Sequence, residues 1–174
     1  MESLSLRDIK SLYSVTTPER QLKQLVYNHE RFISQRLPAC SEAVGYPVET
    51  CCVIFDVQNA SVNNFFRIKD HVIQAVSICH DRYPDLVDKY YVINAPRGHP
   101  LVWNVLKPLL GEVIAAKVDI LGDSYQDALL KQIDEENLPS ILGGKCDCPG
   151  GCSLSDAGPW NPKDELKGKI AKSS

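Results

Sequence analysis

The sequence lacks the features that mark several large classes of protein. No run approaches the roughly 20 apolar residues that a membrane-spanning helix needs, and the first residues, MESLSLRDIK, lack the apolar core of a secretory signal. The formal net charge is -3, so there is no excess of positive charge to favour nucleic acid as a partner. These absences predict a cytosolic chain that binds no nucleic acid.

The sequence also lacks the motifs of common catalytic and nucleotide-binding sites. No glycine-rich phosphate-binding loop follows a predicted strand, because Gly98 and the pair Gly143-Gly144 stand apart from any such pattern. None of the four histidines forms a recognisable acid–base arrangement with a cysteine. We therefore expect a protein that is not an enzyme and that uses no cofactor.

The seven cysteines are an odd number, and without a secretory signal we expect them to be reduced. Those that lie in or beside apolar segments, as small buried hydrophobes do, are Cys40, Cys51, Cys52 and Cys79. Cys146, Cys148 and Cys152 form the sequence C-D-C-P-G-G-C, which differs from the paired C-x-x-C of structural zinc sites. We expect reduced thiols in an exposed loop and no metal; the alternative is a zinc ion with a fourth ligand from elsewhere.

Hydrophobic periodicity predicts strands that alternate with helices. Thr17 and Ser61 are typical helix N-caps. The helix that Thr17 begins is expected to end near Pro38 or shortly after it, and the helix that Ser61 begins is expected to end before Pro84. Unbroken apolar or β-branched runs predict buried strands within residues 48–57, 90–93 and 118–121. This alternation predicts an α/β fold with a mostly parallel sheet and right-handed crossovers. Three strands make a thin sheet for 174 residues, so one edge or face is expected to lack its cover.

The chain is organised around the segment from Lys89 to Leu121, which reads as strand, turn, helix and strand. The predicted helix over residues 101–116 has few charges, and another over residues 62–79 carries the adjacent Phe65 and Phe66. Such apolar surfaces must either pack together or enclose a ligand, whose burial would contribute about 25 cal/mol per Å². A pocket for a hydrophobic ligand and a plain core are both compatible with this composition.

Five stretches between about Leu12 and Trp160 match, in register, the sequence pattern of a known family: RLPACSEAVGYPVET, YYVINAP, the KPLL-to-ILG segment, SYQDALLKQIDEENLPSILGG and SLSDAGPW. Together they resemble the CRAL-TRIO lipid-binding family, and within it the fungal phosphatidylinositol/phosphatidylcholine transfer proteins. The resemblance implies a three-layer α/β domain over residues 1–150. Residues 151–174 are expected to form a partly disordered tail, because the chain after Lys145 is rich in Gly, Pro, Ser and Lys. It also implies that the helical lobe and first strand that open the family's domain are missing, so that the chain is N-terminally truncated.

The resemblance further implies a function. A pocket would hold one phospholipid with its acyl chains inside, and a mobile gate helix over roughly Trp103 to Ala116 would open at a membrane to exchange the lipid without covalent chemistry. The apolar residues of this gate are Trp103, Leu106, Leu109, Leu110 and Val113. We expect a cytoplasmic monomer that visits Golgi or endosomal membranes transiently, the alternative being a chain that needs a partner to cover the missing lobe.

The resemblance carries the head-group residues over unevenly. Lys117 matches the family lysine that pairs with the inositol phosphate, the alternative being a solvated lysine at a helix end. Asp85 stands where the family has a glutamate of the inositol site, while Leu86 replaces an arginine and Ile114 replaces a threonine. Gly144 matches a family glycine near the region that supports the hinge, and a tight turn would equally explain it.

For phosphatidylcholine the match is poorer. The serine and threonine that hold its phosphate are here Cys51 and Val53, and a tyrosine of the choline cage is His29, which supplies little cation–π attraction. We therefore expect phosphatidylinositol as the ligand rather than phosphatidylcholine. Two alternatives remain open: a truncated interaction module without transfer activity, and a carrier of another hydrophobic ligand.

Overall fold

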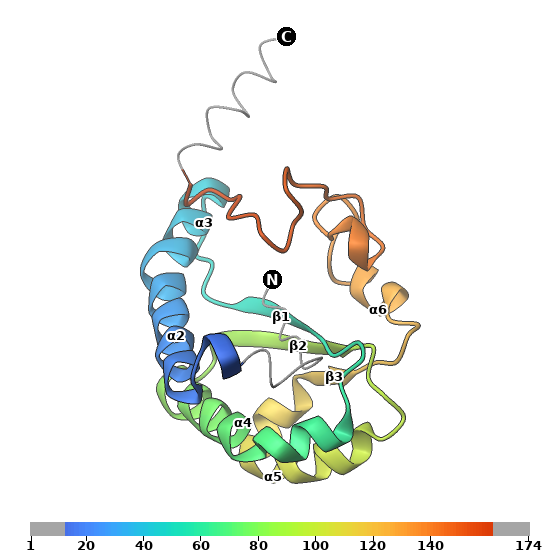
Figure 1. Ribbon diagram of the computed structural model, residues 1–174. Helices are drawn as coiled ribbons and strands as arrows, with labels where there is room; N and C mark the ends of the chain where they lie inside the picture. Colours follow the sequence, from blue (N-terminus) through green and yellow to red (C-terminus); the bar gives the residue numbers. More distant parts are fainter. Residues whose placement is uncertain (1–12, 162–174) are drawn as a thin grey trace.

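Within residues 13–161, which the computed structural model describes, the chain forms a small parallel sheet with flanking helices (Figure 1). The strands, in the order β1-β2-β3, are β1 Cys51–Asp56, β2 Val87–Ile93 and β3 Val118–Ile120. Both pairs are parallel, and the register places Val53 beside Tyr90 and Tyr90 beside Val118. The predicted α/β class and its three strands are confirmed. The division at residue 150 stays a prediction.

Two long helices connect the strands. Helix α4 (Val62–Arg82) links β1 to β2, and α5 (His99–Ala116) links β2 to β3. Consecutive crossovers of one hand place both helices on one face of the sheet, and Figure 1 shows them packed together below it. The Ser61 side chain caps α4 by accepting from the Asn64 N–H at 3.3 Å, as predicted, and α4 ends before Pro84.

The N-terminal helix continues past Pro38 to Val44. Helix α2 (Pro18–Arg31), capped by Thr17, continues through a π-helical turn (Phe32–Arg36) into α3 (Leu37–Val44). The Leu37 N–H donates to the Phe32 carbonyl, five residues earlier. This wider turn accommodates the ring of Pro38, which lies in the first turn of α3 where no N–H is needed. The helix therefore passes the proline and ends at Gly45, whose φ of 79° suits glycine.

The main hydrophobic core lies on the face of the sheet opposite α4 and α5. Helix α6 (Gln126–Leu130) and a 3₁₀ turn (Ser140–Leu142) pack on it. The buried side chains of this cluster are Tyr91, Ile93, Tyr125, Leu129, Leu138 and Leu142. The Tyr91 hydroxyl is satisfied by donating to Gln132 Oε1 at 2.7 Å. The core thus fixes β2 and the segment that follows α6.

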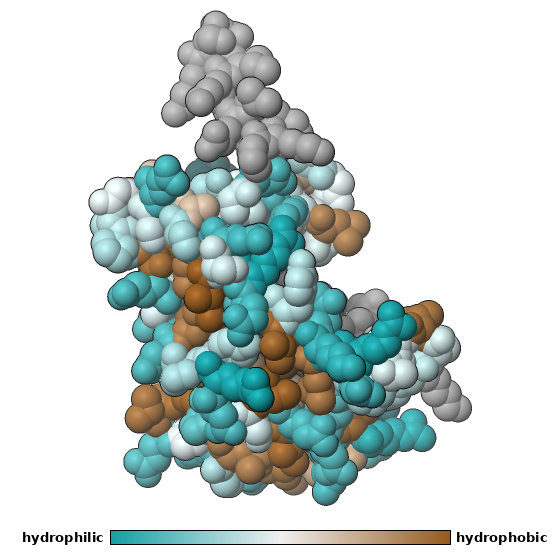
Figure 2. All heavy atoms as spheres, turned by 90° about the vertical axis from the view of Figure 1, so that its left-hand side faces the viewer, coloured by the Kyte–Doolittle hydropathy of each residue, from teal (hydrophilic) through white to brown (hydrophobic). Residues whose placement is uncertain are grey.

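The face toward α4 and α5 is less completely buried. Its apolar side chains, including Val53, Phe55 and Tyr90, are only half-buried, and the rings of Phe55 and Tyr90 stack at 6.3 Å. None of the residues of α5, all of which the structure describes, is buried. Figure 2 shows hydrophobic side chains reaching the surface among hydrophilic ones on the α2 side of the molecule. The apolar side chains on this face of the sheet are therefore only partly covered by α4 and α5.

Residues 151–161 are held against the N-terminal helices. The Asp156 carboxylate accepts from Arg31 at 3.1 Å and from Arg36 at 2.7 Å, and it also accepts from the indole N–H of Trp160 at 3.2 Å. The Arg36 guanidinium lies 5.0 Å from the centroid of the Trp160 ring. The first part of the expected loose tail therefore makes specific contacts. The rest of that tail, after residue 161, lies outside the described residues.

Candidate functional site

The two charged residues that the sequence assigns to a head-group site meet in space. Lys117 Nζ lies 3.5 Å from Asp85 Oδ1 and donates to the Val87 carbonyl at 3.1 Å. Lys117 ends α5 directly before β3, and Asp85 precedes β2. Because β2 and β3 are parallel, both residues lie at the same edge of the sheet, where these strands begin.

This ion pair joins an anchored cation to an exposed anion. The Lys117 side chain is 24% exposed, whereas that of Asp85 is 85% exposed. Such a pair contributes about 0–1 kcal/mol to stability, since water screens it. The Val87 carbonyl holds the ammonium in place independently of the carboxylate. A phosphate could therefore replace Asp85 at little cost in folding free energy.

A pocket opens beside this edge. Its volume is about 660 Å³, and its lining comes from α3, residues 47–50 and the turn at residues 82–86, with Asp85 and Leu86 included. That volume lies within the usual range for small-molecule sites. No residue of α5 lines it, so this pocket is not the cavity expected beneath a gate. Sequence reasoning missed the contribution of α3 to this pocket, because it placed the end of the N-terminal helix near Pro38 or shortly after it.

His29 is fixed by three neighbours. Its Nδ1 lies 2.9 Å from the Leu25 carbonyl, so Nδ1 carries the proton that is donated, and its Nε2 lies 3.7 Å from Cys79 Sγ. The ring stacks on Tyr83, with centroids 4.7 Å apart. Burial and the hydrogen bond from Tyr83 to Glu30 raise the pKa of the Tyr83 hydroxyl. The sequence indicated only that a helix ends before Pro84, so the contact between Tyr83 and His29 was missed.

Cys51 and Val53 form an uncharged wall with Tyr90. Burial raises the pKa of the Cys51 thiol to about 11, with a smaller effect from Cys52, and burial likewise raises the pKa of Tyr90 to about 12. Both groups are therefore neutral at pH 7. The Cys51 N–H donates to the Leu86 carbonyl at 3.0 Å, so these two predicted positions are adjacent. This wall offers no charge to a phosphate.

Helix α5 carries the remaining predicted positions and is broken. Gly111 has φ 68° and ψ 167°, three residues after Pro108, and interrupts the helix. Ile114 and the proposed gate residues Trp103, Leu106 and Leu110 are half-buried, while Leu109 and Val113 are exposed. The helical prediction is confirmed, but the break was missed. Motion of this helix as a gate stays a prediction.

Gly144 occupies a position without room for a side chain. A Cβ there would collide with the Leu138 carbonyl group, and the Gly144 N–H donates to the Pro139 carbonyl at 3.1 Å. Backbone and backbone thus approach as closely as only glycine permits. The role in hinge support that the family resemblance implies stays a prediction.

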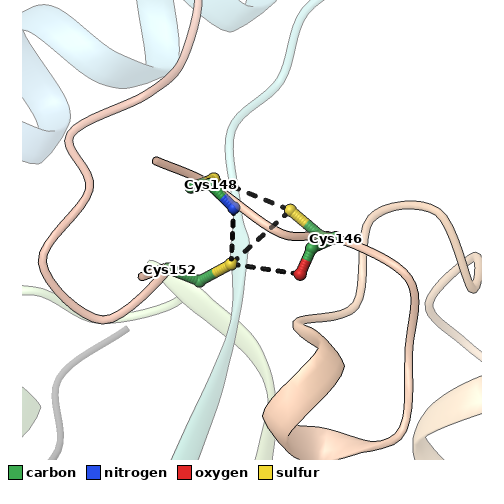
Figure 3. Close-up of side chains that lie close together, drawn as sticks. All are labelled: Cys146, Cys148 and Cys152. Atoms are coloured by element: carbon green, nitrogen blue, oxygen red, sulfur yellow. Dashed lines mark hydrogen bonds between the residues drawn. The ribbon is translucent and has the colours of Figure 1, made fainter. Parts of the chain in front are cut away.

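The three C-terminal cysteines converge (Figure 3). Cys146 Sγ lies 3.7 Å from both Cys148 Sγ and Cys152 Sγ, and the three cysteines are half-buried within a loop whose other residues are mostly exposed. Hydrogen bonds with Cys152 and Cys148 raise the pKa of Cys146 to about 11, whereas the Cys148 N–H lowers the pKa of Cys152. The flanking Pro149-Gly150-Gly151 turn was the available signal for this convergence.

Comparison with known proteins gives a consistent result. Residues 4–144 match the family model described as "CRAL/TRIO domain". The chain is 46% identical over 161 residues to "Sec14 cytosolic factor" of Schizosaccharomyces pombe, an alignment that covers 92% of this chain and 56% of the relative. It is 36% identical over 170 residues to "Phosphatidylinositol/phosphatidylcholine transfer protein SFH12" of Arabidopsis thaliana, covering 96% of this chain and 31% of that protein.

A solved structure, "Crystal structure of Sfh5", aligns with 45% of this chain and 29% of that chain, at a TM-score of 0.42 and 22% identity. The chain spans about half the length of three yeast relatives that it matches, at 54–56% of each. Among the helices of the described residues, none combines the length and the apolar character that crossing a bilayer requires.

Proposed function

The chain belongs to the CRAL/TRIO domain family, and from this we propose that it binds a phospholipid, with phosphatidylinositol as the ligand, and transfers it between membranes. The names of its relatives support this, because several are phosphatidylinositol/phosphatidylcholine transfer proteins. The observation that carries the proposal is the Lys117–Asp85 pair beside the open pocket. It supplies a cation for a phosphate and a carboxylate for hydroxyl groups.

The preference for inositol follows from the chemistry of the two residues. In the complex the Lys117 ammonium turns from the carboxylate to the lipid phosphate while keeping its bond to the Val87 carbonyl. Asp85 is then available to accept hydrogen bonds from inositol hydroxyls, which choline lacks. The short separation of 3.5 Å between Nζ and Oδ1 allows one head group to touch both.

The choline site has lost its polar groups. Cys51 and Val53 replace hydroxyl donors, and the Cys51 thiol stays protonated at pH 7 because burial raises its pKa to about 11. One face of the His29 ring stacks on Tyr83, and an imidazole attracts an ammonium head group less than a tyrosine ring does. A choline head group would therefore be desolvated without compensating contacts.

We propose that the acyl chains lie between the sheet and α5. The exposed Val113, 71% accessible, and the half-buried Trp103 belong to that helix. The break at Gly111 would let the two parts of α5 move separately, so that the helix serves as the gate at a membrane surface. Transfer on this account involves no covalent step, and the protein is a cytoplasmic monomer that contacts Golgi or endosomal membranes transiently.

The test is lipid carriage by the purified chain. Native mass spectrometry identifies co-purified lipid, and transfer of labelled phosphatidylinositol or phosphatidylcholine between liposomes measures exchange. Lys117→Ala should lower phosphatidylinositol transfer about tenfold or more, since a charge-assisted contact contributes about 1.5–3 kcal/mol. Lys23→Ala, which breaks an exposed Lys23–Glu19 pair on α2, serves as the matched control and should transfer normally.

Three results would contradict the proposal in different ways. A chain without bound lipid and without transfer would rule out lipid carriage. A different co-purified apolar molecule would identify another ligand class. Equal transfer by Lys117→Ala and the parent would remove Lys117 from the head-group site.

A further inference from the structure

The cluster of Cys146, Cys148 and Cys152 has no part in the proposed lipid site. Their three sulfur atoms lie within 4.8 Å of one another, and two of the Sγ–Sγ distances are 3.7 Å. With Zn–S bonds of about 2.3 Å, neighbouring sulfurs of a zinc tetrahedron are about 3.8 Å apart. Two sides of the sulfur triangle therefore have the spacing found in such a tetrahedron, and the third is no longer than 4.8 Å.

The backbone holds the sulfurs in this arrangement. Gly150 and Gly151 have φ values of 82° and 90°, and the Gly151 N–H donates to the Cys148 carbonyl at 2.8 Å, which turns the chain back toward Cys146. The Cys146 N–H donates to the carbonyl of the buried Leu138 at 2.9 Å. The site is thus tied to the core and requires little rearrangement to receive an ion.

We propose that Cys146, Cys148 and Cys152 bind one Zn²⁺ as three thiolates. Sulfur ligands select thiophilic ions such as zinc over Mg²⁺ or Ca²⁺, which require oxygen. The Cys148 N–H points at Cys152 Sγ from 3.5 Å and supplies the amide hydrogen bond that supports a bound thiolate. Among the described residues no other histidine, cysteine or carboxylate joins the cluster, so water or a small external ligand takes the fourth position.

The charges balance as follows. The three thiols release three protons to solvent, and the ion with three thiolates carries a net charge of -1. Cys152 then loses the hydrogen bond that its S–H group donates to the Cys146 carbonyl at 3.2 Å. No oxidant or reductant is involved, and the sulfurs remain in the thiolate oxidation state.

The ion would act as a structural clip. On one side of the cluster the chain is anchored in the core at Leu138, and on the other side Asp156 docks on Arg31 and Arg36. Fixing residues 146–152 therefore sets the position from which Asp156 reaches the N-terminal helices. The clip is independent of lipid binding, since none of its cysteines lines the pocket.

The experiment loads the full chain, reduced, with zinc sulfate, removes excess ion, and measures bound zinc by inductively coupled plasma mass spectrometry. We expect about one zinc per chain, at least about tenfold weaker binding in Cys152→Ser, and full binding in Cys52→Ser, an exposed thiol outside the cluster. Replacement of zinc by Co²⁺ should give thiolate-to-cobalt charge-transfer bands and the d–d bands of tetrahedral cobalt. Circular dichroism checks that each variant is folded.

Alkylation of the unmutated chain supplies a test that needs no variant. Zinc should protect Cys146, Cys148 and Cys152 from N-ethylmaleimide while Cys52 still reacts, and a chelator should abolish the protection. The proposal is overturned if zinc retention equals that of the triple cysteine-to-serine variant, or if Cys52→Ser loses the ion. Copper(I) bound in preference to zinc, or a disulfide within the cluster that blocks metal uptake, would overturn it as well.

Discussion

Lys117 and Asp85 meet at the edge of the sheet where β2 and β3 begin, with Nζ 3.5 Å from Oδ1, although they are separated by 32 positions in the sequence. The parallel pairing of β2 with β3 brings the turn before β2 next to the residue before β3. The cation is also held by the Val87 carbonyl, while the carboxylate projects into solvent. The pair therefore contributes little to folding and is available to a ligand.

Asp85→Asn separates these two roles. Asparagine tolerates the left-handed backbone of residue 85, where φ is 60°, and keeps a hydrogen-bond acceptor. The free energy of unfolding in urea should change by less than about 1 kcal/mol, because the pair is exposed. Phosphatidylinositol transfer should fall several-fold, less than in Lys117→Ala. Unchanged transfer in the liposome assay would mean that Asp85 does not contact the head group.

Restoring polar groups should restore choline-lipid transfer. The triple change Cys51→Ser, Val53→Thr and His29→Tyr supplies two hydroxyls to the uncharged wall and an aromatic ring at residue 29 on α2. Phosphatidylcholine transfer should rise several-fold relative to phosphatidylinositol transfer, because hydroxyl donors and a cation–π face compensate the desolvated head group. Cys51→Ala with Val53→Ala is the control that changes two of these positions without adding donors. A rise in the control as large as in the triple variant would contradict this explanation.

Gly144→Ala should destabilise the fold severely. The added methyl group would collide with the Leu138 carbonyl, and relief requires moving a buried segment of backbone. We expect a loss of about 2–4 kcal/mol in the free energy of unfolding, measured in urea, as for other overpacked sites. Gly122→Ala is the matched control, since a Cβ at residue 122 meets no atom within 4 Å. Similar stability of the two variants would show that the segment at residue 144 yields easily.

Asp156 should make stability depend on acid pH. Burial alone would raise the pKa of Asp156, but hydrogen bonds from Trp160 and Arg31, with the charge of Arg36, lower it below its usual value of 3.8. A carboxyl with a depressed folded-state pKa stabilises the fold fully above its unfolded pKa, and this contribution is lost as the pH falls through the folded pKa. The carboxylate is 40% exposed, so solvent screening limits the contribution.

Near neutral pH, Asp156→Asn should therefore unfold at a lower urea concentration than the parent, because its free energy of unfolding is lower by about 1 kcal/mol. The difference from the parent should shrink as the pH falls below the ordinary carboxyl pKa, and urea titrations from pH 7 down to acid measure it. A difference that stays constant with pH would assign the effect to packing rather than to charge.

Local signals in the sequence predicted the local structure well. The N-caps Thr17 and Ser61 and the strand at Tyr90 to Ile93 follow from neighbouring residues, because caps and buried strands are defined within a few positions. The π turn before Pro38 was not predictable in this way. Proline usually ends a helix, and only the wider turn, which has no simple sequence signature, allows it to continue.

The candidate site was likewise predicted only in part from the sequence. The family resemblance named Lys117 and Asp85, and the sheet brings them together. The stacking of His29 on Tyr83, the break at Gly111 and the docking of Asp156 depend on side chains or angles set by the complete fold. No pattern within one segment encodes such contacts, so sequence reasoning left them out.

The contact between Arg36 and Asp156 joins positions 120 residues apart. A ribosome adds about 5–20 residues per second, so the arginine would leave the exit tunnel roughly 6–24 s before its partner. During that interval the N-terminal helices lack their contact with Asp156. Contacts between distant residues form late, because closing the long loop between them costs entropy. The contact thus forms only after residue 156 has been synthesised, and a chain interrupted before it would leave Arg31 and Arg36 without this carboxylate.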